Sequence, residues 1–191
     1  MKKDIILSGV GGQGILSTAA IIGLAAIESG LFVKQAEVHG MSQRGGAVQS
    51  HLRISSREIS SDLIPFGSAD MILSIEPMES LRYLPYLSAD GWIITNITPF
   101  VNIPDYPNLE TLLHQIRSYK NVVAIDADRM ARKVSSPKSS NVVLLGAASG
   151  HLEIPYRNLE SGIRTLFGGK GERIVEINLS ALKAGLESAQ Q

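Results

Sequence analysis

Two glycine-rich stretches contain the residues best suited to bind a ligand. In the first, residues 9–14 read Gly-Val-Gly-Gly-Gln-Gly and fit the G-x-G-x-x-G spacing. In such a strand-to-helix turn the first glycine permits the tight turn, the second lets the backbone approach a ligand, and the third lets the helix pack close to the sheet. Turn amides beside the positive end of a helix dipole suit a phosphate, a carboxylate or another anion. The candidate ligand-binding residues here are Gly9, Gly11, Gly12, Gln13 and Gly14.

The second stretch, residues 39–46, reads His-Gly-Met-Ser-Gln-Arg-Gly-Gly. Arg44 is followed by two glycines, so its cation sits on a backbone that other groups can approach closely. An arginine can clamp a carboxylate or a phosphate with two hydrogen bonds. Ligands of open α/β sheets bind beyond the carboxyl ends of the strands, so this loop should lie beside the first one. The candidate ligand-binding residues here are Ser42, Gln43, Arg44, Gly45 and Gly46.

The remaining sequence offers little chemistry. There is no G-x-S-x-G elbow, no Walker lysine after the glycine turn and no paired acid and base in one segment, so we predict no catalytic residue in this chain. His39 and His51 are too few for a metal site, and we predict no metal. The chain contains no cysteine, which excludes a disulfide framework, a thiolate nucleophile and a cysteine-ligated iron–sulfur cluster.

Composition and charge also exclude some partners and locations. Lys plus Arg equals Asp plus Glu at 18 each, so we expect no attraction to nucleic acid or to an anionic membrane. The longest apolar helical run, residues 15–27, is too short to span a bilayer. Residues 1–4 lead directly into a predicted strand, without the apolar core of a signal peptide. We therefore expect a cytoplasmic protein.

Strand and helix patterns alternate along the chain. We predict strands at 5–7, 31–38, 47–54, 70–75, 91–95 and 122–125, and helices at 15–28, 77–86, 109–119, 126–134, 141–152, 155–167 and 172–188. This order indicates one α/β domain over residues 1–191: a Rossmann-like, mostly parallel sheet with helices on both faces and a helical C-terminal region. The strand at 47–54 should pair antiparallel near an edge, residues 58–60 should return as a short antiparallel arm, and the proline-rich residues 99–107 should form a loop.

The glycine spacing alone leaves alternatives open. Glu37 lies near the end of the second predicted strand, where a free-standing NAD(P)- or flavin-binding Rossmann protein has an acidic residue for the ribose. In that interpretation Arg44 would accept a 2′-phosphate. A third interpretation is a purely structural partner, in which the glycine turn serves only packing.

The two glycine motifs, in this order and about two dozen residues apart, resemble the gamma subunits or domains of 2-oxoacid:ferredoxin oxidoreductases. The form Val-His-Gly-Met-x-Gln-Arg-Gly-Gly at 38–46 is most similar to the beta subunit of the indolepyruvate branch of that family. The resemblance continues through 47–54, 91–95, 141–146 and 178–185, and so covers nearly the whole chain.

This resemblance implies an enzyme that oxidatively decarboxylates a 2-oxo acid, here an arylpyruvate, with coenzyme A to acyl-CoA, carbon dioxide and reduced ferredoxin. It implies that thiamine diphosphate, magnesium and iron–sulfur clusters lie on a large partner subunit, through which ferredoxin is reached. The absence of cysteine, and of a Gly-Asp-Gly motif followed by an Asn-Asn pair, agrees with that division. The chain is then an accessory subunit, inactive alone, whose glycine loops contact coenzyme A or the partner.

Overall fold

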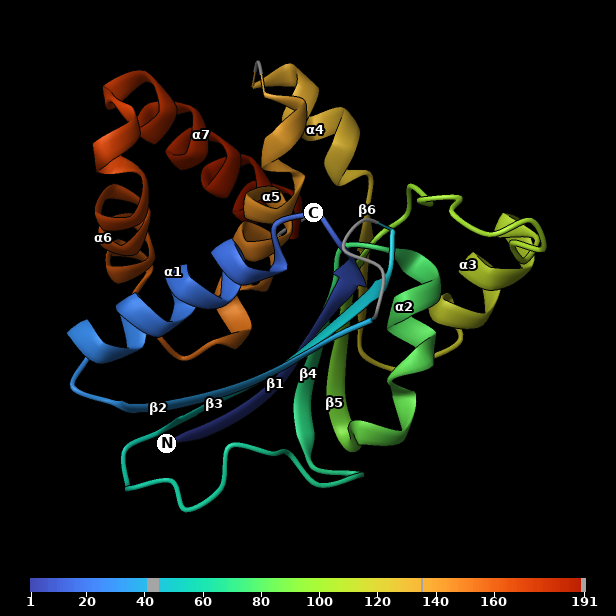
Figure 1. The fold of residues 1–191 in the computed structure, drawn as a ribbon, viewed down its shortest axis with the longest axis horizontal. Helices are drawn as coiled ribbons and strands as arrows, with labels where there is room; N and C mark the ends of the chain where they lie inside the picture. Colours follow the sequence, from blue (N-terminus) through green and yellow to red (C-terminus); the bar gives the residue numbers. More distant parts are fainter. Residues whose placement is uncertain (41–44, 135, 190–191) are drawn as a thin grey trace.

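A computed structural model describes residues 1–40, 45–134 and 136–189 of the chain. Its centre is a six-stranded sheet in the order β2-β3-β1-β4-β5-β6, with helices on both faces (Figure 1). The strands are β1 (Lys2–Val10), β2 (Phe32–His39), β3 (Ala47–Ser55), β4 (Ala69–Ser74), β5 (Leu87–Asn96) and β6 (Val122–Ile125).

The helices divide unequally between the two faces. One face carries α1 (Ile15–Glu28), α5 (Ser140–Ala148), α6 (Tyr156–Phe167) and α7 (Glu172–Ala189), with α4 (Ala127–Lys133) packed on α5 and α7. The other face carries α2 (Pro77–Arg82) and α3 (Leu109–Arg117). Short 3-10 turns are η1 (Leu84–Tyr86), η2 (Pro137–Ser139), η3 (Ser149–His151) and η4 (Gly168–Lys170). The predicted α/β architecture and the helical C-terminal region are confirmed.

The central strand β1 explains why both faces must be covered. Ile5 and Leu7 are buried in the large core under α1 and α5, whereas Ile6 points the opposite way, into the core beside η1. A strand buried on both sides reads as a continuous apolar run, and residues 5–7 have that pattern.

The sheet is mostly parallel, with β3 as the exception. β1, β4, β5 and β6 pair in parallel, while β3 pairs antiparallel with β1 on one side and with β2 on the other. The antiparallel pairing predicted for residues 47–54 is confirmed, and β2 is the edge strand.

The predicted antiparallel arm at residues 58–60 is wrong, because residues 56–68 form an irregular loop. The guanidinium of Arg53 donates from Nη1 to the backbone oxygens of Ser61 and Leu63, both at 3.0 Å. The amide of Ile64 donates to His51 Nδ1 at 2.9 Å. Side chains of β3 thus satisfy backbone groups that strand pairing would otherwise use.

Most other elements begin and end close to their predicted positions, but β1 extends three residues beyond its predicted bounds at each end, and β5 begins at Leu87 rather than at residue 91. The helix predicted to reach residue 86 stops at Arg82 and continues as η1, since Pro85 has no backbone N–H to continue the helix. Residues 99–107 contain no helix or strand, as expected. Helix α6 starts after Pro155 and ends at Gly168, which matches the tendency for proline at helix starts and glycine at helix ends.

The loops that follow β1, β2, β4, β5 and β6 all lie at the carboxyl edge of the parallel strands. After β1 the chain passes to the α1 face, and after β4 it passes to the α2 face, so a switch point lies between these strands.

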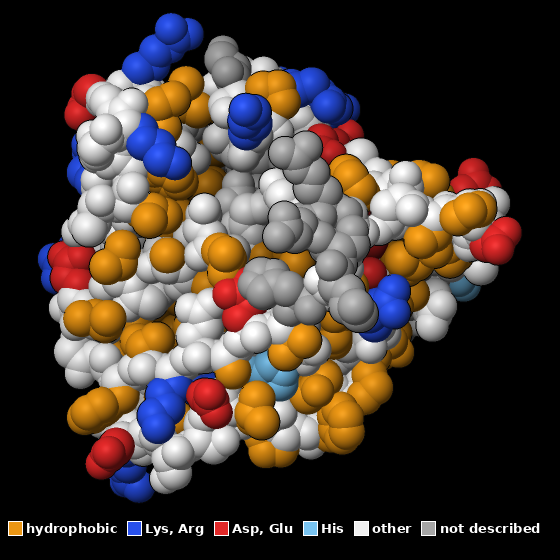
Figure 2. Space-filling view, in the orientation of Figure 1, with side chains coloured by type: hydrophobic (Ala, Val, Ile, Leu, Met, Phe, Trp, Pro, Cys, Tyr) orange, Lys and Arg blue, Asp and Glu red, His pale blue; other side chains and the backbone are white. Residues whose placement is uncertain are grey.

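Figure 2 shows Lys and Arg side chains gathered at the top of the view, around α4 and the α6–α7 junction. None of the helices in the described ranges is long and apolar enough to cross a membrane.

Candidate functional site

The two glycine stretches meet at the carboxyl edge of the sheet, as predicted. The amide of Gly11 donates to the carbonyl oxygen of Gly46 at 2.9 Å, and the amide of Gly40 donates to the carbonyl of Ala47 at 2.9 Å. Gly45 has a φ of 78°, a left-handed conformation that favours glycine. The structure therefore brings Gly9, Gly11, Gly12, Gln13, Gly14, Gly45 and Gly46 together. Ser42, Gln43 and Arg44 lie outside the described residues.

The first turn is fastened by its own glutamine. Gln13 Oε1 accepts a hydrogen bond from the amide of Val10 at 2.7 Å. A Cβ atom on Gly9 would lie 2.8 Å from that oxygen, so Gly9 leaves the space that the Gln13 side chain occupies. Gly14 begins α1 with a φ of 84°, and a Cβ there would lie 2.7 Å from Asn141 Nδ2. The third glycine thus makes room for a side chain of α5, whereas the motif led us to expect close packing of α1 on the sheet.

Only part of the turn is free to receive an anion. The amide of Gly11 is bonded to Gly46, and the amide of Gln13 donates to the carbonyl of Val10 at 3.1 Å. Within the described ranges, the amides of the turn that have no backbone partner are those of Gly12, Gly14 and the first turn of α1. Gly12 has a φ of 98° and is exposed, and a Cβ there would meet no atom within 4 Å.

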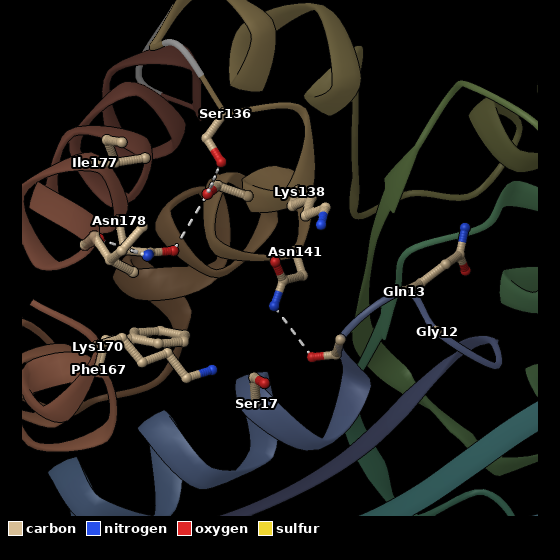
Figure 3. A pocket seen from close by; sticks show the side chains of 13 residues that line it. Gly12, Gln13, Ser17, Ser136, Lys138, Asn141, Phe167, Lys170, Ile177 and Asn178 are labelled. Atoms are coloured by element: carbon tan, nitrogen blue, oxygen red, sulfur yellow. Dashed lines mark hydrogen bonds between the residues drawn. The ribbon is translucent and has the colours of Figure 1, made fainter.

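A cavity of about 290 Å³ lies beside the start of α1 (Figure 3). One wall is the glycine turn with Ser17, and the opposite wall comes from η2, α5, the end of α6, η4 and α7. Asn141 Nδ2 bridges the two walls by donating to the Gly14 carbonyl at 3.1 Å and to Thr18 Oγ1 at 3.3 Å. The described lining residues are Gly12, Gln13, Gly14, Ser17, Ser136, Lys138, Ser139, Asn141, Phe167, Lys170, Ile174, Ile177 and Asn178.

The polar wall is held by hydrogen bonds within the η2 segment and between η2 and α7. Ser139 Oγ hydrogen-bonds to Asn178 Oδ1 at 3.3 Å and to Ser136 Oγ at 3.0 Å. Asn178 Nδ2 donates to the carbonyl of Ile174 at 2.8 Å. Ser139 and Asn178 are buried, so this network fixes the wall without using solvent.

The cavity is electropositive. Lys138 and Lys170 contribute ammonium groups, and no acidic side chain is among the described lining residues. Lys170 Nζ lies 5.3 Å from the centroid of the Phe167 ring, and within the described ranges neither lysine forms an ion pair. The positive end of α1 adds to their field. This arrangement suits a phosphate or another multiply charged anion.

The sequence patterns did not point to Lys138, Lys170 or Asn141. These residues lie more than 120 positions beyond the glycine turn, and only folding brings them to it. The polar segment 135–140 between two predicted helices was the one local signal near them.

A second cavity, of about 330 Å³, lies on the other side of the same turn. Its lining is mostly apolar and consists of Val10, Gly11, Gly12, Gly14, Ile15, Leu16, Ser17 and Val48. The glycine turn thus forms a ridge between an electropositive cavity and an apolar one.

The sheet order counts against a dinucleotide site at Glu37. In a dinucleotide-binding sheet the acidic residue ends the strand next to the glycine turn. Here β3 lies between β1 and β2, and Glu37 is opposite Ser50 of β3. Two strand spacings, about 10 Å, therefore separate the end of β2 from the end of β1.

Within the described residues no three His, Cys, Asp or Glu side chains are grouped so as to hold a metal ion.

A buried carboxyl group attaches a third loop to this edge. Glu76 Oε2 accepts from the amide of Glu79 at 2.9 Å and caps α2, while Glu76 Oε1 accepts from the amide of Phe100 at 3.3 Å and from the Tyr106 hydroxyl. Burial, and then the hydrogen bond to Glu76, raise the pKa of Tyr106, which keeps the phenol protonated as a donor. Asn102 Nδ2 donates to the Gly45 carbonyl at 2.5 Å. The loop 97–108 therefore adjoins the second glycine stretch.

Residues 4–188 match the family described as pyruvate ferredoxin/flavodoxin oxidoreductase. The indolepyruvate oxidoreductase subunit IorB of Archaeoglobus fulgidus is 38% identical over 99% of this chain and 96% of its own length. The chain belongs to the pyruvate ferredoxin/flavodoxin oxidoreductase family. The resemblance seen in the glycine motifs is therefore confirmed.

Two solved structures share the fold of this chain. A keto/oxoacid ferredoxin oxidoreductase gamma subunit from Geobacter sulfurreducens is 26% identical, with a TM-score of 0.71 and 98% of each chain covered. The 2-oxoglutarate:ferredoxin oxidoreductase of Magnetococcus marinus, solved with 2-oxoglutarate, coenzyme A and succinyl-CoA bound, shares the fold at 23% identity and a TM-score of 0.78. The match covers 99% of this chain but 31% of that longer chain, so the same fold occurs both alone and within a larger polypeptide.

Proposed function

We propose that this chain is the accessory subunit of an indolepyruvate or related arylpyruvate ferredoxin oxidoreductase. The enzyme oxidatively decarboxylates the 2-oxo acid with coenzyme A and gives acyl-CoA, carbon dioxide and reduced ferredoxin. The similarity to the Archaeoglobus subunit extends over 99% of the chain and supports the substrate class. In this proposal residues 1–191 form one gamma-type domain.

The chain depends on a larger partner for its redox chemistry. It contains no cysteine, so iron–sulfur clusters ligated by cysteine belong to the partner, together with thiamine diphosphate and magnesium. Thiamine diphosphate, when bound there, supplies the carbanion stabilisation that decarboxylation needs. Ferredoxin reaches the assembly through the same partner. The contribution of this chain is to bind and orient a co-substrate.

Coenzyme A is the co-substrate that fits the cavity beside α1. Its phosphate groups are multiply charged anions, and the electropositive cavity offers Lys138, Lys170 and the first-turn amides of α1. The uncharged pantetheine arm then crosses the exposed Gly12, where no side chain obstructs it, towards the apolar cavity. The observation that carries this assignment is the electropositive cavity beside the glycine turn, whose two lysines form no ion pair with any described residue.

The test is a kinetic comparison in the reconstituted complex with the large subunit. Lys138→Gln combined with Lys170→Gln should raise the KM for coenzyme A about tenfold or more, because two charge-assisted contacts to phosphate are lost. The KM for indolepyruvate should not change. The matched control is Lys120→Gln, at an exposed lysine between α3 and β6, which should leave both constants unchanged.

Three results would contradict the proposal. An unchanged KM for coenzyme A in the double variant would remove the cavity from the binding site. Saturable binding of NAD(P) or a flavin by the isolated chain, measured by calorimetry, would support the free-standing Rossmann alternative. Arylpyruvate-dependent reduction of a viologen dye by the large subunit alone, at full rate, would show that this chain is not required.

A further inference from the structure

The loop between β5 and α3 exposes large apolar side chains. Phe100 is 44% exposed, Val101 67% and Ile103 40%. No charged residue occurs between positions 96 and 104. In Figure 2 hydrophobic side chains gather on the projection at the right, which this loop and α3 form. Contiguous apolar surface of this kind on a folded chain marks a place where another molecule binds.

The loop is held in place while it presents these side chains. Glu76, which is fully buried, accepts hydrogen bonds from the Phe100 amide and the Tyr106 hydroxyl, near the two ends of the loop. Between them, Asn102 donates to the Gly45 carbonyl. Because these contacts, one from the backbone and two from side chains, hold the loop at three points, the loop loses little conformational entropy when a partner binds.

An apolar groove continues from the end of this loop. It lies between α2 and α3, has a volume of about 210 Å³, and is lined by Met78, Leu81, Pro107, Asn108, Thr111, Leu112 and Gln115. Pro107 belongs both to the loop and to the groove, so the two form one surface. We call Phe100, Val101, Ile103 and this groove the apolar face.

We propose that the apolar face is the docking surface for the large subunit, which inserts an uncharged, apolar segment there. Positions 97–104 of the loop carry no charge, and the one charged residue in 97–108 is the acidic Asp105, which favours an apolar protein segment over a nucleic acid or an anionic ligand. In the Magnetococcus chain the same fold is 31% of a longer polypeptide, so the fold is joined there to further protein. In the proposed complex the large subunit is the corresponding neighbour.

The apolar face lies close to the candidate coenzyme A site. The link between docking and coenzyme A binding rests on the proposed function. Asn102 lies within the docking loop and contacts Gly45, and Gly46 is bonded to Gly11 of the glycine turn. A subunit docked on the loop therefore stands beside the glycine ridge. Docking of the large subunit then also completes the candidate coenzyme A site.

The test uses the tagged chain co-expressed with the large thiamine-diphosphate subunit, with the complex measured after affinity purification. Val101→Asp and Ile103→Asp place a charge on the apolar face and should raise the Kd of the complex at least about tenfold. The matched control is Ile27→Asp, since Ile27 is 63% exposed at the far end of α1. It should leave the Kd unchanged. Thermal unfolding of each isolated variant should match the unmodified chain, because these side chains are outside the core.

The possible outcomes distinguish a wrong docking surface from a wrong proposed function. If the unmodified chain binds the large subunit and Val101→Asp binds equally well, the apolar face is not the interface, while the proposed function stands. The same holds if only Phe66→Asp weakens the complex, since Phe66 is 72% exposed in the loop before β4, at the amino edge of the parallel strands. If the unmodified chain forms a dimer that Val101→Asp dissolves, the face serves self-association and the inference is overturned. If the unmodified chain does not bind the large subunit, the proposed function fails.

Discussion

Gly146 of α5 and Gly185 of α7 face each other where the two helices cross, and a Cβ atom on Gly146 would lie 3.0 Å from the Gly185 Cα. The helix backbones are therefore in direct contact. This contact sets the position of α7, which supplies Ile174, Ile177 and Asn178 to the wall of the electropositive cavity. The stability of the fold and the shape of the site depend on the same crossing.

Gly185→Ala should destabilise the protein strongly. The added Cβ would lie 1.8 Å from the Val143 carbonyl oxygen, so the helices must separate. Overpacking of this kind costs about 1–3 kcal/mol or more in free energy of unfolding. Urea denaturation checks the value. Gly150→Ala is the control, since a Cβ there meets no atom within 4 Å, and an equal loss in both variants would contradict the crossing as the cause.

Glu76→Gln should loosen the loop 97–108. Its two oxygens receive hydrogen bonds from Glu79 on one side and from Phe100 and Tyr106 on the other. The glutamine amide has one oxygen acceptor, so on one of these two sides its NH₂ group faces another donor. The lost hydrogen bond costs about 1.5–3 kcal/mol in the free energy of holding the loop. Amide hydrogen exchange across residues 97–108 should accelerate. Tyr106→Phe should have a smaller effect, because the Phe100 contact remains, and unchanged exchange in Glu76→Gln would show that the carboxyl group does not hold the loop.

His51 should make stability fall on acidification. Burial, and more weakly Arg53, lower its pKa, against an opposing effect of Asp62. Its Nδ1 accepts from the Ile64 amide, and its Nε2 lies 2.6 Å from the side-chain amide of Gln49. The unfolded chain takes up the proton first, so the stability present above about pH 6.5 is lost as the pH falls below it.

The measurement for His51 is the free energy of unfolding at pH 7.5 and pH 5.5. His51→Asn keeps an acceptor for the Ile64 amide but does not titrate in this range. The variant should therefore lose less stability than the unmodified chain between the two pH values. An identical loss in both proteins would mean that His51 does not contribute to the acid sensitivity.

Arg44→Lys should lower function even though the net charge is unchanged. Lysine keeps the cation but loses the planar fork that holds a phosphate or carboxylate with two hydrogen bonds. The expected loss is about 1.5–3 kcal/mol, or roughly tenfold to a hundredfold in affinity. KM values for coenzyme A and for the arylpyruvate in the reconstituted complex identify the ligand, because only one of them should rise. Arg57→Lys is the control, and a complex that dissociates more readily with both KM values unchanged would assign Arg44 to the interface.

Local signals in the sequence were sufficient for most of the fold. Residues 5–7 read as a buried strand, Pro77 and Pro155 marked helix starts, and Gly168 marked a helix end, because each depends on neighbours within one or two turns of chain. The prediction that the two glycine stretches share an edge was also confirmed, since it needed only the direction of the strands.

Contacts between distant segments could not be predicted in the same way. Asn141 bonds to Gly14 across 127 positions, and nothing near either residue indicates the other. The arm expected at 58–60 failed because Arg53 and His51 bind the backbone there, which strand propensity does not describe. The position of β3 between β1 and β2 counts against a dinucleotide site, and it depends on sheet pairing rather than on the glycine spacing.

The position of β3 in the sheet is fixed from both sides. Val48, Leu52 and Ile54 of β3 face the large core, whereas the alternate residues face the other way. A slip of β3 by one residue against β1 and β2 would exchange these two sets, because side chains of a strand alternate with a period of two. The core thus holds the register of β3, so a change in the length of the connection at 40–46 should leave the pairing of β3 unchanged.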